Sequence, residues 1–146
     1  MTYSMPRGPR ANRSAQAYAN IGLETEVLSA SPERLITLLY DGALAAIAKA
    51  RLYMENNNAQ GRGVALSKAI DIIESGLKAS LNMEAGGDLA KNLSATYDLM
   101  ISHLMLANLR NDTSKLDLAE NMLREIADAW KTSVDTPKAK NGAAAA

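Results

Sequence analysis

Apolar residues recur at helical spacing in four long segments of the chain. Helices are therefore expected over residues 31–56, 62–84, 88–110 and 114–133. In the second segment, the apolar residues follow one another at intervals of four, three, four and four: Leu66, Ile70, Ile73, Leu77 and Leu81. Strand-like alternation of apolar and polar residues is absent. Segments of similar length joined by short connections predict an all-α fold, an antiparallel up-down four-helix bundle.

Residues that cap or interrupt helices mark the ends of these segments. Ser31 is suited to cap a helix that has Pro32 in its first turn. Ser114 and Asp117 have the spacing of a capping box at the start of the last helix. The expected breaks are Asn56–Asn58, the loop glycines Gly61 and Gly63, Gly86–Asp88, and Asn111–Ser114.

The bundle is flanked by segments of different composition. Residues 1–14 are rich in Pro, Gly, Arg and Ser and are expected to be disordered. Residues 15–30 are mildly apolar and are expected to form a short helix or an extended arm, so that the domain spans residues 15–133. Residues 134–146 end in an alanine-rich stretch and are also expected to be disordered.

The first long helix carries more apolar surface than one core can cover. From Leu35 to Ala48 only Thr37, Asp41 and Gly42 are not apolar. The apolar positions cover roughly two-thirds of the circumference, whereas a surface helix needs a stripe of a little over 100°. A further segment must therefore cover the remainder.

The third long helix has a similar surplus in its C-terminal half. Met105 and Leu109 lie roughly opposite the stripe formed by Leu93, Tyr97 and Leu104. Residues 15–30 could fold back over these surfaces and complete the core. Alternatively, the surfaces form a groove for an amphipathic helix of a partner. The two interpretations are compatible if the N-terminal segment is a displaceable cover.

Composition narrows the function classes. The formal net charge is zero, so no broad field attracts nucleic acid or a membrane surface. The chain contains no Cys, as is typical of a reducing compartment, and no apolar run approaches the length of a membrane span. We therefore expect a cytoplasmic protein that neither binds nucleic acid nor inserts into a membrane.

Catalytic and cofactor motifs are also lacking. The one histidine, His103, has Met100 three residues before it, whereas a di-iron bundle would carry Glu-x-x-His motifs on two helices. Neither a nucleophile motif nor a phosphate-binding loop is present. The sequence predicts no enzyme, no metal site and no cofactor.

Five short stretches resemble the flagellin export chaperone family (FliS). In chain order they are Ala17-Tyr18-Ala19, Leu39-Tyr40-Asp41-Gly42-Ala43, Lys68-Ala69-Ile70, Ala107-Asn108-Leu109-Arg110-Asn111-Asp112 and Ile126-Ala127-Asp128-Ala129-Trp130. Their order and spacing make the match specific, and it covers about residues 15–133. The resemblance implies a cytoplasmic four-helix bundle that binds the disordered C-terminal segment of flagellin one-to-one.

The resemblance also implies further partners and a role for the arm. Members prevent premature flagellin polymerisation and help present flagellin to a membrane protein of the export gate. A flagellar anti-sigma factor is a further possible partner. The residues expected to form the N-terminal cover, or to contact the export gate, are Tyr18, Ile21 and Leu23. Helical angles suggest a flagellin groove of Leu35, Leu38, Tyr40, Gly42, Leu44, Leu93, Tyr97, Met105, Asn108 and Leu109.

Two alternatives from other classes remain open at this point. The surplus apolar surface could hold two copies of the chain together in a structural bundle that binds no flagellin. The second alternative is an enzyme or a signalling bundle with His103 as its active group.

Overall fold

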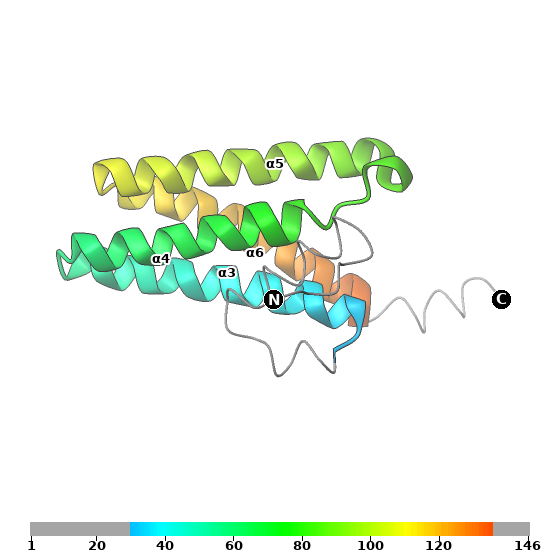
Figure 1. Cartoon of the computed structure of the whole chain (residues 1–146), viewed down its shortest axis with the longest axis horizontal. Coiled ribbons are helices and arrows are strands. Elements are labelled where there is room, and N and C mark those ends of the chain that lie inside the picture. The colour runs from blue at the N-terminus through cyan, green and yellow to red at the C-terminus, as the bar shows by residue number, and fades with distance from the viewer. Residues whose placement is uncertain (1–29, 136–146) are drawn as a thin grey trace, which may run out of the picture.

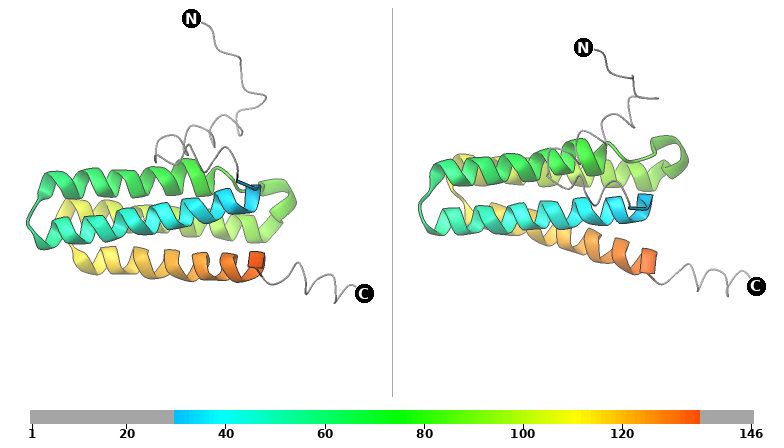
Figure 2. Two further views of the ribbon diagram at one scale, coloured as in Figure 1. Left: turned by 90° about the horizontal axis from the view of Figure 1, so that it is seen from below. Right: turned by 60° about the horizontal axis from the view of Figure 1, so that its bottom comes forward.

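A computed structural model describes residues 30–135, which fold into helices with no strand among them. The elements are α3 (Pro32–Glu55), α4 (Ala59–Asp71), the π-helix η1 (Ile72–Lys78), α5 (Met83–Arg110) and α6 (Thr113–Asp135). Because η1 continues α4, four rods lie side by side and alternate in direction (Figures 1 and 2). The expected all-α bundle is confirmed. The expectations for residues 1–14, for 15–29 with Tyr18, Ile21 and Leu23, and for 136–146 concern residues outside the described part.

The first helix begins and ends where the sequence indicates. The side chain of Ser31 accepts a hydrogen bond from the backbone N–H of Arg34 at 3.1 Å, and Pro32 opens α3. The helix ends at Glu55, and Asn57 follows with a φ of 56°. Asparagine tolerates this left-handed conformation better than most residues.

Two expected boundaries are corrected. Gly61 and Gly63 lie inside α4, because Asn58 caps this helix by accepting a hydrogen bond from the N–H of Gly61 at 2.8 Å. The second rod ends at Lys78 rather than 84, and α5 begins at Met83 behind the capping Asn82. Within α5 the backbone at Gly87 is not helical, so the expected break at Gly86–Asp88 is present as a kink. The φ of 53° and ψ of −131° at Gly87 are readily adopted only by glycine.

The last helix starts one residue earlier than expected and ends two residues later. Asp112, rather than Ser114, precedes its first residue and accepts hydrogen bonds from the N–H of Ser114 at 2.9 Å and from its hydroxyl at 2.6 Å. These bonds, with the hydroxyl bond the larger cause, lower the pKa of Asp112. At the other end, α6 includes Val134 and Asp135, which the sequence assigns to the tail.

The order of the helices around the core fixes which surfaces can meet. α3 packs against α4, η1 and α6, and α5 packs against the same three elements, so α3 and α5 lie across the diagonal of the bundle. The core consists mainly of Leu, Ile, Ala and Met side chains from every rod. The hydroxyls of Tyr40 and Tyr97 meet in it at 2.7 Å and link the diagonal helices.

Polar contacts tie α3 to α6 along the bundle. Arg51 forms ion pairs with Asp117, at 2.7 Å, and with Glu120. Two further contacts join these helices: Lys131 to Asp41 at 2.7 Å, and the indole N–H of Trp130 to the hydroxyl of Thr37 at 3.0 Å.

The seam between α3 and the second rod depends instead on small residues. A Cβ placed on Gly61 would lie 2.5 Å from Cδ1 of Tyr53, and one on Gly76 would lie 2.9 Å from Cδ2 of Leu39. Glycine at these two positions therefore lets the rods approach closely.

Candidate functional site

The diagonal arrangement separates the predicted groove residues into different surfaces. Half of them are on α3 and half on α5, and these helices do not line a common groove. Tyr40 and Tyr97 are core residues, at 4% and 2% exposure, so they are not available to a partner at the surface. Leu38 is also buried, while Leu35 and Leu44 are half-buried and pack against the core. Helical angles alone placed Leu38, Tyr40 and Tyr97 too far toward the surface.

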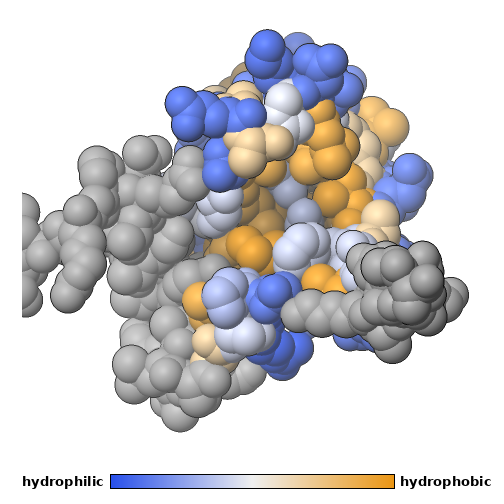
Figure 3. Space-filling view, turned by 90° about the vertical axis from the view of Figure 1, so that its right-hand side faces the viewer, coloured by the Kyte–Doolittle hydropathy of each residue, from blue (hydrophilic) through white to orange (hydrophobic). Residues whose placement is uncertain are grey.

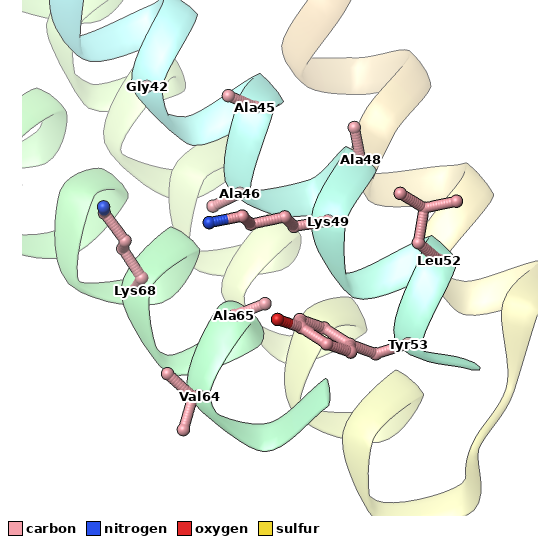
Figure 4. A pocket seen from close by; sticks show the side chains of 10 residues that line it. All are labelled: Gly42, Ala45, Ala46, Ala48, Lys49, Leu52, Tyr53, Val64, Ala65 and Lys68. Atoms are coloured by element: carbon pink, nitrogen blue, oxygen red, sulfur yellow. The ribbon is translucent and has the colours of Figure 1, made fainter. Parts of the chain in front are cut away.

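An apolar hollow lies between α3 and α4 (Figure 4). It has a volume of about 660 Å³ and is open to solvent along one side. Its lining residues are Gly42, Ala45, Ala46, Ala48, Lys49, Leu52, Tyr53, Val64, Ala65 and Lys68. We call this feature the α3/α4 groove. Gly42 is the only predicted site residue in its lining.

Small side chains form the floor of the α3/α4 groove, and larger ones form its rim. Leu52 and Val64, at 58% and 68% exposure, present apolar side chains from opposite helices. Tyr53 extends from α3 with its hydroxyl toward Ala65 of α4 (Figure 4). A floor of small residues allows a partner's backbone to approach closely, and the rim side chains can then enclose it.

A second apolar surface lies on α5. Met105 and Leu109 are 58% and 77% exposed. They follow Asp98 at intervals of seven and four residues, so all three share one face of the helix. Asp98 forms an ion pair with Lys78 of η1 at 2.7 Å, which shows that this face borders the second rod. The second rod therefore has apolar surface along both of its sides.

Asn108 is engaged within the bundle. Its side-chain oxygen accepts a hydrogen bond at 3.1 Å from Nε of Arg62, whose Nη1 also bonds Asn111 at 3.0 Å. These contacts join α4 to α5 beside Leu109. Asn108 thus has a local structural partner, in addition to the groove role expected of it.

Apolar side chains are also exposed at the end of the bundle where α3 begins and α6 ends (Figure 3). Leu35 and Leu93 belong to the parts of α3 and α5 at this end. Leu93 lines a recess of about 310 Å³ between α5 and α6, together with Leu89 and Ile126. This recess is smaller and more polar than the α3/α4 groove.

Comparison with known proteins places these surfaces in context. The sequence profile of the family described as "Flagellar protein FliS" matches residues 14–137. The chain belongs to the FliS family. It is 51% identical over 127 residues to the flagellar secretion chaperone FliS of Escherichia coli K12, covering 87% of this chain and 93% of that protein.

Two further relatives carry the same description. Identity to the flagellar secretion chaperone FliS of Salmonella typhimurium is 51%, over 80% of this chain and 86% of the relative. Identity to the flagellar secretion chaperone FliS of Bacillus subtilis is 32%, over 79% of this chain and 84% of the relative. FliS is a family of flagellar chaperones and not of enzymes.

His103 lies half-buried on α5. Nδ1 of His103 is buried without a hydrogen-bond partner in the described part of the chain. Across residues 30–135, no three His, Asp or Glu side chains gather as metal ligands would. Within the same residues, every helix is too short or too polar to cross a bilayer.

Sequence reasoning missed most residues of the α3/α4 groove. Ala45, Ala48 and Leu52 lie on the outer part of the wide apolar arc of α3, and Val64 lies in a segment predicted to begin with a loop. The available signal was the cluster of small residues from Gly42 to Ala48. It indicates close approach by another backbone, but only the position of α4 shows where.

Proposed function

We propose that this protein binds the disordered C-terminal segment of flagellin in a one-to-one complex, prevents its premature polymerisation and aids its delivery to the flagellar export gate. The α3/α4 groove is the observation that carries this proposal. Its apolar floor and its exposed rim residues Leu52 and Val64 offer contact area that the bundle itself does not use. Relatives named flagellar secretion chaperones support the flagellar destination of the cargo.

Binding of such a segment is folding coupled to association. A free segment has an amphipathic pattern but cannot bury its apolar face alone. Each Leu- or Ile-sized side chain that enters the groove contributes about 1.5–3 kcal/mol, from which the cost of ordering the segment is subtracted. A segment held in this way cannot pair with other flagellin subunits.

The exposed face of α5 extends the contact around the second rod. Met105 and Leu109 border α4 from the side opposite the α3/α4 groove. A long segment can occupy the groove and continue onto this face without any rearrangement of the core. We assign four residues of the predicted site to this contact: Gly42, Met105, Asn108 and Leu109.

The N-terminal arm is proposed as a displaceable cover. Residues 15–30 precede the cap of α3, and sixteen extended residues span roughly 50 Å, which is longer than α3 itself. The apolar residues Tyr18, Ile21 and Leu23 would cover groove surface in the free protein or contact the export gate in the complex. Replacing Ile21 with Glu is expected to raise the affinity for flagellin if the arm competes with it.

Release and further partners follow from the same surface chemistry. We assign no nucleotide, metal or other cofactor to the cycle, so release occurs through competition or through handover to the membrane protein of the export gate. A flagellar anti-sigma factor could use the same apolar surface. The complex is proposed to form in the cytosol, before export.

Calorimetric titration with the C-terminal segment of flagellin from the same genome tests the proposal. Wild-type protein is expected to bind one-to-one with a large negative heat-capacity change. Leu52→Glu removes a rim contact and places a charge there, so binding should weaken tenfold or more. Leu118→Glu makes the same change at a 45% exposed position on α6, outside the groove, and should leave binding unchanged.

The titration also separates the alternatives. Absence of heat at every temperature would contradict flagellin binding. A stable dimer in sedimentation, together with that absence, would favour the self-associating bundle. Near-neutrality of His103→Gln is expected if the protein is a chaperone.

A further inference from the structure

The α3/α4 groove carries two lysines that have no ion-pair partner among the described residues. Lys49 extends from α3 and Lys68 from α4, and both side chains line the groove. Three other cations form ion pairs across helices in the described part: Arg51 with Asp117, Lys78 with Asp98, and Lys131 with Asp41. The two lysines thus lie on either side of a mostly apolar groove.

The register of the helices brings the two lysines to about the same level. Gly61 lies against Tyr53, and Gly76 lies against Leu39, which fixes the antiparallel alignment of the second rod on α3. In this alignment Lys68 is about level with Ile47, less than one helical turn from Lys49. Figure 4 shows both ammonium groups on the same side of the groove.

Two positive charges at one level of an apolar groove repel each other, and an anionic group between them removes this repulsion. Their aliphatic stems add apolar surface at the rim, while the ammonium groups stay at the edge, where a partner side chain can reach them. A carboxylate at this place gains two ion pairs and cancels the repulsion between the lysines. The hydroxyl of Tyr53 adds a further polar group on the groove wall.

We propose that Lys49 and Lys68 select an acidic position of the bound segment, and that the segment lies in the groove as an amphipathic helix with a carboxylate between the two ammonium groups. This inference rests on the proposed function and adds to it the charge and the orientation of the cargo. The small lining residues of α3, Gly42, Ala45, Ala46 and Ala48, accommodate the closely packed face of that helix. The carboxylate fixes its register along the groove.

Calorimetry with the full-length chain and the same flagellin segment tests the inference. Lys49→Gln with Lys68→Gln is expected to weaken binding about five- to tenfold, the effect of losing two partly exposed ion pairs. The dependence of affinity on salt should also become shallower. Both lysines are exposed, so helicity and thermal midpoint should remain at wild-type values.

A matched control removes the same charge elsewhere. Lys91→Gln with Lys115→Gln changes two lysines outside the groove, on α5 and α6, and should leave affinity unchanged. Equal weakening in both double variants would overturn the inference, because it would indicate a general field effect. Unchanged affinity in the Lys49 and Lys68 variant would overturn it as well.

Charge reversal identifies the partner group. Lys49→Glu with Lys68→Glu should weaken binding further, and a segment in which one acidic residue is changed to Lys should recover it. Failure of every acidic-to-Lys segment to recover affinity would contradict a carboxylate contact. If wild-type protein does not bind the segment at all, the proposed function itself fails. A dimer that disappears in the Lys49 and Lys68 variant would make a second copy the occupant instead.

Discussion

The hydroxyls of Tyr40 and Tyr97 illustrate how one polar contact can be held inside an apolar core. Both rings are buried, and each hydroxyl is satisfied by the other at 2.7 Å. Trp130 packs beside Tyr40 with ring centroids 6.5 Å apart. A buried polar group without a partner destabilises the fold, whereas removing both members of a pair at once can be almost neutral.

Single and double substitution of this pair should therefore differ in a non-additive way. Tyr40→Phe or Tyr97→Phe alone leaves one buried hydroxyl without its partner, which should lower the free energy of unfolding by about 1–2 kcal/mol. The double variant should lose less than the sum of the two single variants. Urea denaturation at neutral pH measures this difference. Strictly additive losses would show that the hydroxyls do not depend on each other.

The same pair predicts a loss of stability at alkaline pH. Burial raises the pKa of Tyr40 and of Tyr97, and the neighbouring Tyr40 raises that of Tyr97 further. Below the unfolded pKa of about 10, both states keep their protons and the contribution of the pair is fully present. Above that pH the unfolded chain releases protons that the folded chain retains. The free energy of unfolding then falls by up to about 1.4 kcal/mol per pH unit for each tyrosine.

Comparison with the double phenylalanine variant isolates this effect. Between pH 10 and 11, the free energy of unfolding should fall less steeply in this variant than in wild type. The difference between the two slopes should be up to about 2.7 kcal/mol per pH unit, the sum for two tyrosines. Urea denaturation across this range gives both slopes, and the other titrating groups cancel in the comparison. Equal slopes would show that the two tyrosines titrate alike in the folded and unfolded chains.

Among the elements, the second rod shows how glycine can serve packing inside a helix. Gly76 in η1 faces Leu39, which is completely buried and has little room to move. Gly63 in α4 faces open space, since an added Cβ would meet only the side-chain oxygen of Asn108, at 3.9 Å. The two glycines therefore differ in packing, although both lie in helical segments.

Replacing each glycine with alanine should change stability in opposite directions. Gly63→Ala should raise the free energy of unfolding by about 0.5–1 kcal/mol, because alanine is the better helix former. Gly76→Ala should lower it by about 1 kcal/mol, because overpacking against Leu39 outweighs the gain in helix propensity. Urea denaturation of both variants provides the measurement. A stabilising Gly76→Ala would mean that the α3 seam can widen at no cost.

At the scale of the whole molecule, the order of the helices decides which apolar surfaces a partner can reach. The surplus apolar positions of α3 and α5 do not form one groove, because these helices are diagonal. They lie instead on the two sides of the second rod. A bound segment must therefore pass over α4 if it is to contact both.

Leu109→Glu tests whether the bound segment extends this far. Because Leu109 is largely exposed, the change should alter the free energy of unfolding by no more than about 0.5 kcal/mol. Affinity for the flagellin segment should fall, as it does for Leu52→Glu, while Leu118→Glu remains at the wild-type value. Circular dichroism and calorimetry measure both properties. If only Leu52→Glu weakens flagellin binding, the contact is restricted to the α3/α4 groove. If Leu109→Glu unfolds the protein, Leu109 belongs to the core.

The sequence by itself determined the helices, their class of fold and the existence of unused apolar surface. Helical periodicity is a local property, and so is the Ser31 cap that begins α3. The surplus at Met105 and Leu109 was visible because too many faces of one helix are apolar for a single core. The family resemblance was carried by ordered stretches of sequence and needed no structure.

Tertiary structure alone decided which apolar residues are core and which line a groove. Helical angles give a residue's direction from its own axis, but not the neighbour in that direction. Tyr40 and Tyr97 therefore looked like groove residues until the diagonal pairing of α3 and α5 placed them together inside. Gly61 of α4 looked like a loop residue because its close packing depends on Tyr53, a residue of another helix. The groove exists only where two separately encoded helices meet.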